Sequence, residues 1–299
     1  MSLTKSQANN EQELVIAQAL ETDEGRTALA QAMVEPIRRS LEYQAVGRKL
    51  LMVDELPQGA LARYERDVAA IAFVLSRRGA APDQIQEGEE VLVPTWEIVA
   101  NPTIRLSEIK ARRFYIVDRA QIKAKEAIQK EEDDQIFSAL IAAATNRGNQ
   151  IYTATGGRLT PLALNVAYRY IEEHDLVTQK VVMHPRRYAD VRFFNGGGDT
   201  TATVKFYDEA TVREILTTGL YGHLWTADIH VTSRMGASQV LCVASPDTVG
   251  AFPIRQDITV LPADDPKKLR LGWVIYEEVG VAVLNDYAVS LINVTGSAS

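Results

Sequence analysis

The chain has 299 residues, of which 46% are hydrophobic and 24% are charged, and its formal net charge is −7. This length permits one large domain or two ordinary ones with a sizeable core. The net negative charge argues against a protein that binds the phosphate backbone of nucleic acid. No window approaches the roughly 18 apolar residues of a membrane span, so no membrane association is expected. The single cysteine, Cys242, lies in the apolar run 239–245, so we expect a buried thiol, no intramolecular disulfide and a reducing compartment.

The first hundred residues divide into two segments of different composition. Within 11–43, apolar residues recur at spacings of three and four, which predicts two short helices. Because such helices cannot form a core alone, we expect residues 1–46 to be an arm that packs on another surface. Within 47–100, strand-like runs at 67–79 and 89–99 flank a polar connector and predict a long two-stranded hairpin. An isolated hairpin is marginal in water, so this one should lie on a partner surface.

One long helix is predicted from about residue 117 to residue 146, a span of about 45 Å at about 1.5 Å per residue. Its second half, residues 136–144, is apolar nearly all round, which predicts burial on several sides. We interpret the acidic run in the middle as a solvated patch or as a surface that faces a neighbouring molecule. This run consists of Glu131, Glu132, Asp133 and Asp134. Gly148 is the expected stop of the helix.

From residue 159 onward the pattern alternates between helix and strand. A helix is predicted after Thr160, the expected N-cap, with Pro161 in the first position. Short strands are predicted at 180–184, 227–233, 239–245, 249–255 and 258–262, and helices at 185–194 and 208–219. A flexible loop is expected around Gly196, Gly197 and Gly198. The tract 271–294 predicts two long strands about a turn at Asn285 and Asp286.

No residue pattern points to catalysis or to a cofactor. His223, Asp228 and His230 occur within one short segment, but their spacing matches no familiar metal site, so we expect no metal. The adjacent carboxylates Glu277 and Glu278 lie in a predicted strand and should point to opposite faces, so they cannot serve together as an acid and base pair. The glycine-rich loop lacks a phosphate-binding pattern and follows a helix. We therefore expect no enzymatic activity and no cofactor.

The order of the parts is more informative than any single motif. Two stretches carry a resemblance: PQGALARYERD leading through VPTWEIVANPTIRLSEIKARRFYIVDRA to QIKAKEAIQKEEDDQIFSAL, and LTTGLYGHLWTADIHVTSRM followed by LGWVIYEEVGVAVLND. In layout and texture, the chain resembles the major capsid proteins of HK97-type tailed phages over about residues 26–294. The resemblance implies an α+β fold with five parts: an N-terminal arm (1–46), an extended hairpin or E-loop with its base (47–100), a P-domain with the long spine helix (101–158), an A-domain (159–266) and closing P-domain strands (267–299).

The resemblance also implies a function. A viral major capsid protein assembles with itself, as hexamers and pentamers, into an icosahedral shell that encloses the phage genome. The expected location is the virion capsid, after assembly in the host cytoplasm. The implied partners are further copies of the chain, a portal, a cement protein, and either a separate scaffolding protein or none. Packaged DNA would meet the shell without sequence-specific contacts.

Contacts between subunits are expected to use the hairpin. The candidate residues there are Arg63, Tyr64, Arg66, Arg77 and Arg78, and the acidic run of the spine helix is one candidate partner on a neighbour. Some members of this family join subunits through a lysine of the E-loop and an asparagine of a neighbour. This chain has no lysine between Leu50 and Ile109, so we expect no lysine-derived cross-link from this loop.

Three other interpretations stay open. An encapsulin has the same fold but encloses a protein cargo instead of a genome. A tail or connector protein of a virion would form rings or tubes. From a different class, a soluble α+β enzyme would use His223, Asp228 and His230, and it would require these side chains to converge in a pocket.

Overall fold

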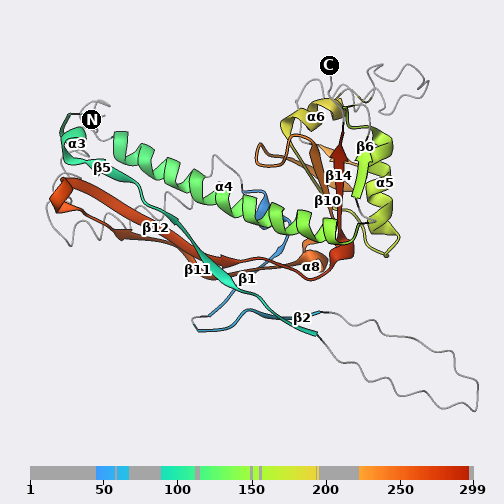
Figure 1. Cartoon of the computed structure of the whole chain (residues 1–299), viewed down its shortest axis with the longest axis horizontal. Helices are drawn as coiled ribbons and strands as arrows, with labels where there is room; N and C mark the ends of the chain where they lie inside the picture. The colour runs from blue at the N-terminus through green and yellow to red at the C-terminus, as the bar shows by residue number, and fades with distance from the viewer. Residues whose placement is uncertain are drawn as a thin grey trace, which may run out of the picture.

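The structure is a computed structural model that describes residues 45–57, 59–66, 89–111, 115–148, 151–154, 157–192, 194 and 222–295. Two six-stranded sheets and one long helix make up most of this mixed α+β structure, and a two-stranded ladder extends away from them (Figure 1). Several predicted features lie outside the described residues. They are the arm helices within 11–43, the hairpin segment 67–88 with Arg77 and Arg78, the loop of Gly196, Gly197 and Gly198, and the helix at 208–219.

The longest element is helix α4 (Tyr115–Asn146), which begins two residues before its predicted start. Its 32 residues span about 48 Å at about 1.5 Å per residue. Buried apolar side chains recur along it, at Ala124, Ile128, Ile136 and Leu140. Gly148, with φ of +61°, follows the last turn and confirms the predicted stop. Among the helices that the structure describes, none combines the length and the apolar character that a bilayer crossing requires.

The first sheet is built on a long antiparallel hairpin. Strand β11 (Gly250–Pro262) pairs with β12 (Arg270–Gly280), and their polar connector contains the 3-10 helix η2 (Pro266–Lys268). Four shorter strands complete the sheet: β1 (Met52–Glu55) lies parallel to β11, β13 (Ala282–Val283) also pairs with β11, and β4 (Thr95–Ala100) and β5 (Thr103–Arg105) pair with β12. Helix α3 (Leu106–Ala111) follows β5, and α4 then runs along this sheet (Figure 1).

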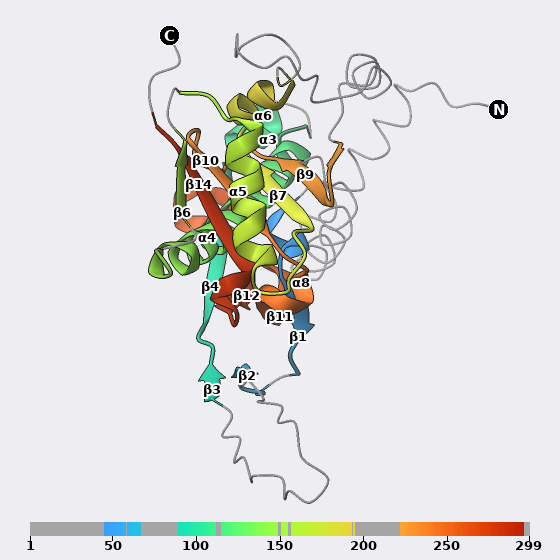
Figure 2. The ribbon, with the colours of Figure 1, turned by 90° about the vertical axis from the view of Figure 1, so that its right-hand side faces the viewer.

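The second sheet has the strand order β6-β14-β10-β7-β9-β8. Its strands are β6 (Ile151–Ala154), β7 (Lys180–Met183), β8 (His223–Leu224), β9 (Ala227–Val231), β10 (Gln239–Val243) and β14 (Val289–Val294). Helix α5 (Pro161–Glu172) covers one face of it, and α6 (Pro185–Arg192) follows β7 (Figure 2). The side chain of Thr160 accepts a hydrogen bond from the amide of Ala163, which confirms the predicted helix start. Cys242 is fully buried on β10, as predicted, and burial raises the pKa of its thiol.

The predicted hairpin at 67–79 and 89–99 differs from the described structure. The observed ladder pairs β2 (Arg63–Arg66) with β3 (Glu89–Leu92), and residues 95–100 do not continue it. They form β4 in the first sheet instead. Pro94 separates the two strands, because a proline cannot donate to a ladder and therefore ends a run of pairing.

The C-terminal pairing was also predicted wrongly. Both expected strands exist, but β12 pairs with β11 and β14 pairs with β10 and β6, so the two strands belong to different sheets. Between them lie β13 and the 3-10 helix η3 (Asp286–Ala288), where the side chain of Asn285 accepts the amide of Tyr287. The short strands predicted at 249–255 and 258–262 are one strand, β11, with shifts of register around Gln256. A β-bulge bends a strand without ending it.

Candidate functional site

The described chain begins with a short segment that crosses the middle of α4. This root segment, residues 45–51, contains the 3-10 helix η1 (Gly47–Lys49) and leads into β1. Its apolar side chains Leu50 and Leu51 are 0% and 2% exposed and belong to the main hydrophobic cluster. The root segment is therefore the point at which residues 1–44 join the folded body.

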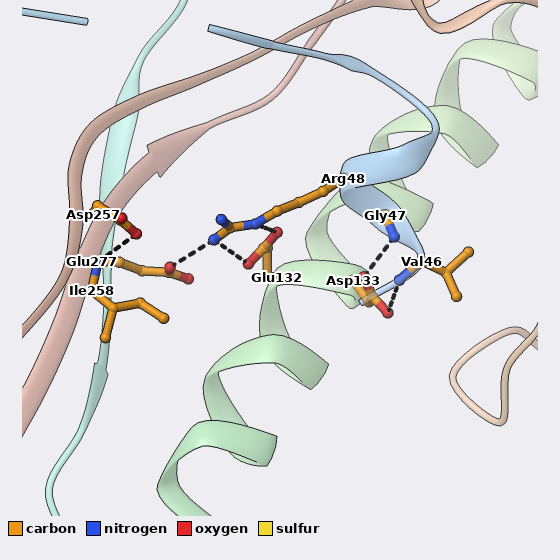
Figure 3. Close-up of polar contacts among 8 residues, drawn as sticks. All are labelled: Val46, Gly47, Arg48, Glu132, Asp133, Asp257, Ile258 and Glu277. Carbon is orange, nitrogen blue, oxygen red and sulfur yellow. Dashed lines mark hydrogen bonds and ion pairs between the residues drawn. The ribbon is translucent and has the colours of Figure 1, made fainter. Parts of the chain in front are cut away.

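A buried carboxylate on α4 holds the start of the root segment. Asp133 is 0% exposed, and it accepts the backbone amides of Val46 at 3.2 Å and of Gly47 at 2.8 Å (Figure 3). These hydrogen bonds satisfy two donors at the start of η1, where no side-chain cap from the segment itself is present. A hydrogen bond to an ionised acceptor is about twice as strong as one between neutral groups.

Gly47 lies so close to α4 that a side chain has no space there. A Cβ atom at this position would lie 2.6 Å from Cδ1 of Ile136 and 2.8 Å from Oδ1 of Asp133. Glycine is therefore required by the approach of the root segment to the helix, although its backbone needs no positive φ.

The next residue, Arg48, joins the root segment to two further elements. Its Nε and Nη2 atoms donate to the two oxygens of Glu132 on α4 at 2.6 and 2.9 Å, and Nη2 also donates to Oε2 of Glu277 on β12 at 3.1 Å (Figure 3). Glu132 is 1% exposed and Glu277 is 0% exposed. Asp257 on β11 lies beside this group and accepts the amide of Ile258 at 2.8 Å. We call Arg48, Glu132, Asp257 and Glu277 the Arg48 cluster.

The Arg48 cluster has more negative than positive charge. Burial, followed by the charge of Glu132, raises the pKa of Glu277 from its ordinary value of 4.5 to about 8, although Arg48 opposes both effects. Burial likewise raises the pKa of Glu132, against the hydrogen bond from Arg48. For Arg48, burial alone would lower the pKa, but the hydrogen bond and charge of Glu132 outweigh it and keep the guanidinium protonated. The cluster can therefore hold a proton or release one.

The structure corrects the interpretation of the acidic run on α4. Glu132 and Asp133 were predicted to be solvated or to face a neighbouring molecule, and this is wrong, because both are buried against partners in their own chain. Glu131 is exposed and accepts from Gln135, and Asp134 forms an ion pair with Arg234. Successive helical residues differ by about 100° in direction, so four consecutive acids cannot share one environment.

One signal in the sequence could have located Glu132. It lies four residues after Ile128 and four before Ile136, and both of these neighbours are buried. The apolar stripe therefore continues through the carboxylate, which marks it as an inward-facing residue. No comparable signal identifies Arg48, since it lies 84 residues from Glu132 and 229 from Glu277.

The predicted hairpin residues that are described lie on the β2–β3 ladder or beside it. Arg63 forms an exposed ion pair with Glu90 at 3.1 Å, across the ladder. The hydroxyl of Tyr64 donates to Asp54 on β1, and burial and this hydrogen bond raise its pKa. Arg66 is paired in register with Glu89.

A groove runs between β4 and α4. Its volume is about 460 Å³, and its lining residues are Trp96, Glu97, Ile98, Val99, Ala100, Ala127, Ile128, Glu131 and Gln135. Val99 is 54% exposed, and the Nε1 atom of Trp96 is buried without a hydrogen-bond partner among the described residues. In the described part of the sheet, β4 pairs only with β12, so its other edge is free.

The residues of the alternative enzyme interpretation lie at the surface of the second sheet. Nδ1 of His223 lies 3.0 Å from Asp228, whose pKa is lowered by the hydrogen bond from Lys180 at 2.7 Å. His223 is 75% exposed, and His230 is half-buried, with its pKa lowered by burial. The groove described above has no contribution from these residues. Among the described residues, no three His, Cys, Asp or Glu side chains gather as metal ligands would.

Comparisons with known proteins give matches by structure and none by sequence. No protein-family model matches the chain, and no curated protein does. A mature capsid of bacteriophage PhiM1 superposes with a TM-score of 0.58 at 11% identity, over 85% of this chain and 88% of that one. The capsid of cyanophage P-SCSP1u gives a TM-score of 0.59 at 12% identity, over 85% and 89%. A virus-like particle from Pyrococcus furiosus gives 0.55 at 15% identity, over 88% and 97%.

These matches cover 85–88% of this chain and 88–97% of the compared chains. At identities of 11–15% they establish the fold. The chain has the HK97-type capsid fold, as the sequence resemblance predicted.

Proposed function

We propose that the chain is a major capsid protein that assembles with itself into the closed icosahedral shell of a phage. The observation that carries this proposal is the length of the structural match, since 84–88% of the chain superposes on phage capsids and a virus-like particle. The role is structural, without catalysis or cofactor. The exposed charge pair of His223 and Asp228, 75% and 39% exposed, suits a solvated surface better than an active site.

Under this proposal, the parts of the chain take the roles of an HK97-type subunit. Residues 1–46 form the N-terminal arm, 47–100 the E-loop with its base, 101–158 the P-domain with α4 as spine, 159–266 the A-domain and 267–299 the closing P-domain strands. The pairing of β12 with β11 and β4 supports one amendment, since it makes residues 95–100 and 250–262 parts of the same sheet as β12.

The neighbour's hairpin is proposed to lie in the groove between α4 and β4. The β2–β3 ladder extends beyond the body, where Leu61 and Leu92 are 53% and 60% exposed (Figure 2). Two strands alone are marginally stable in water, so this ladder requires a surface to lie on. Within one chain, β3 leads directly into β4, which forms one wall of the groove, and the ladder extends away from that groove. The ladder can therefore lie only in the groove of a second copy.

The chemistry of the groove suits the hairpin. Glu97 and Glu131 supply exposed carboxylates at its wall, and Val99 supplies exposed apolar surface. In the hairpin sequence, the predicted contact residues Arg66, Arg77 and Arg78 flank an apolar run at residues 68–75. Arginine can bind a carboxylate through two parallel hydrogen bonds. Among the four consecutive acids of the acidic run on α4, Glu131 and Asp134 therefore remain the proposed partners, and Asp134 would have to share its charge with Arg234.

Electron microscopy of the purified chain tests the proposal. We expect closed shells when the chain is expressed alone or with the proteins encoded beside its gene. A homogeneous monomer or small ring in both preparations would contradict it, and rings or tubes would favour a tail or connector protein.

An encapsulin is the second candidate, favoured by the match to the virus-like particle from Pyrococcus furiosus over 97% of that chain. The contents of shells purified from the native source discriminate the two. Nucleic acid inside supports the phage capsid, whereas a single co-purifying protein cargo supports the encapsulin. Neighbouring genes for terminase and portal, or for a cargo enzyme, provide an independent check.

A further inference from the structure

The Arg48 cluster brings three carboxylates from three elements to one guanidinium. The charged groups that act on Glu277 are Glu132 from α4, Arg48 from the root segment and Asp257 from β11. With all of them ionised, the cluster would carry three negative charges and one positive charge. Asp257 is half-buried, but Glu132 and Glu277 are both buried around the single guanidinium of Arg48. Such an excess of negative charge is costly, and a protein avoids the cost by keeping one acid protonated.

The geometry indicates which carboxyl group holds the proton. Glu132 forms the two-bond fork with Arg48, which is the arrangement that favours an ionised carboxylate. Glu277 receives a single hydrogen bond, at Oε2, and its Oε1 atom is buried without a hydrogen-bond partner in the described structure. If Glu277 were ionised, this oxygen would carry negative charge without water or a donor to stabilise it. A protonated Glu277 avoids this cost because its carboxyl group is neutral.

We propose that Glu277 carries a proton at neutral pH and that this proton controls how firmly the root segment is held against α4. When the proton leaves at alkaline pH, a second negative charge appears beside Glu132 and competes for Arg48. Both carboxylates then share one guanidinium, and the fork from Arg48 to Glu132 weakens. The root segment, which carries Arg48, then loosens from the helix.

The sign of the pH dependence follows from the raised pKa of Glu277. Its folded value of about 8 lies above the ordinary value of 4.5, so the stabilisation is complete below about pH 4.5 and is lost as the pH rises through about 8. One proton linked to folding changes the folding equilibrium constant by up to about tenfold per pH unit within this window. The hold on the root segment should therefore decrease from neutral to alkaline pH.

The consequence concerns residues 1–44, which join the body through this segment. The segment that links them to the body is held by contacts that depend on a titratable group in the core, so a change in pH should alter that hold. This inference does not rest on the proposed shell, because each of its contacts lies within one subunit.

Hydrogen exchange of the full-length protein between pH 6.5 and pH 9.5 tests the inference. The probes are the amides of Val46 and Gly47, which donate to Asp133. A protection factor compares the observed exchange rate with that of an unfolded amide at the same pH, so the direct effect of pH on exchange cancels. We expect protection at these two amides to fall at least tenfold over this range in the wild type. In Glu277→Gln, which cannot release a proton, we expect protection to stay constant.

Glu278→Gln is the matched control. Glu278 is the adjacent residue, but it lies on the other face of β12 and binds Arg255 and Thr95. This variant should show the same loss of protection as the wild type. An equal loss of protection in Glu277→Gln, or constant protection in the wild type, would overturn the inference.

A second measurement needs no variant. At neutral pH, the infrared spectrum of the wild type should contain the carbonyl band of a buried protonated carboxyl group, and this band should disappear near pH 9.5. Its absence at neutral pH would overturn the inference even if Glu277→Gln failed to fold. Failure to form shells, by contrast, would affect only the proposed function.

Discussion

At the scale of single residues, direction along the helix decides environment. Four consecutive acids on α4 have the same chemistry, yet Glu132 and Asp133 are buried whereas Glu131 is exposed. The two buried carboxylates are tolerated because each accepts two hydrogen bonds from the root segment. These carboxylates in turn hold the root segment in place. Without this contact, the buried carboxylates on the helix and the donors of the segment would lose the hydrogen bonds that they make to each other.

Gly47→Ala should weaken this contact. The added methyl group would overlap with Ile136 and Asp133, at 2.6 and 2.8 Å, so the root segment must move away from α4. We expect the free energy of unfolding to fall by about 1–3 kcal/mol, the usual cost of overpacking a core. Denaturant unfolding of the dissociated subunit measures it. The control is Gly222→Ala, where a Cβ meets nothing within 4 Å, and an equal effect of both substitutions would contradict the argument.

Local sequence signals predicted the elements that depend on local contacts. The C-terminal end of α4, the N-cap Thr160 and the buried Cys242 follow from periodicity, capping chemistry and apolar context, and all three were confirmed, whereas the helix starts two residues before its predicted start. The Arg48 cluster was not predictable, because its partners come together only after two sheets and a helix have packed. The pairing of β12 was likewise mistaken, since proximity along the chain suggested β14, whereas β12 pairs with β11, β4 and β5, all of which precede it.

At the scale of elements, the edge of β4 that pairs with no described strand and the ladder β2–β3 are two incompletely covered surfaces. Both expose apolar side chains, Val99 on the first and Leu92 on the second. Edge strands and isolated ladders normally gain stability by pairing or by being covered. Placing the ladder of one subunit over the groove of another would complete both surfaces with one contact.

A charge reversal across this contact should impair assembly and a double reversal should restore it. Glu131→Arg removes a carboxylate from the groove, and Arg78→Glu reverses the matching charge on the hairpin of the neighbour. We expect each single variant to lower the yield of shells at least several-fold and the double variant to recover most of it, measured by sedimentation. Glu172→Arg, an exposed acid on α5, is the control. If the yield of shells does not recover when Glu131→Arg is combined with a reversal of Arg66, Arg77 or Arg78, the hairpin does not bind in this groove.

At the scale of the whole molecule, the two sheets and α4 share one hydrophobic cluster. Phe252 from the first sheet and Leu241 from the second are both fully buried in it. The packed body therefore forms one cooperative core, and under the proposed function the ladder that leaves it would reach a neighbouring subunit. Many weak contacts repeated over a shell give a stable assembly without any covalent bond.

We therefore expect shells without covalent cross-links through the hairpin. A lysine in this loop would be needed for the amide bond, and residues 51–108 contain none. On a denaturing gel, mature shells should give a single band at the position of the monomer. A ladder of covalent oligomers, with a cross-linked peptide from this loop in mass spectrometry, would contradict this expectation.

The position of β14 in the second sheet has a consequence for shortened chains. Residues 289–294 lie between β6 and β10, so this strand fills an interior place in the sheet. A chain cut before residue 289 lacks this strand and leaves the edges of β6 and β10 without their common neighbour. Such a chain cannot complete the second sheet, so loss of these six residues should disrupt the fold and not only the tail of the protein.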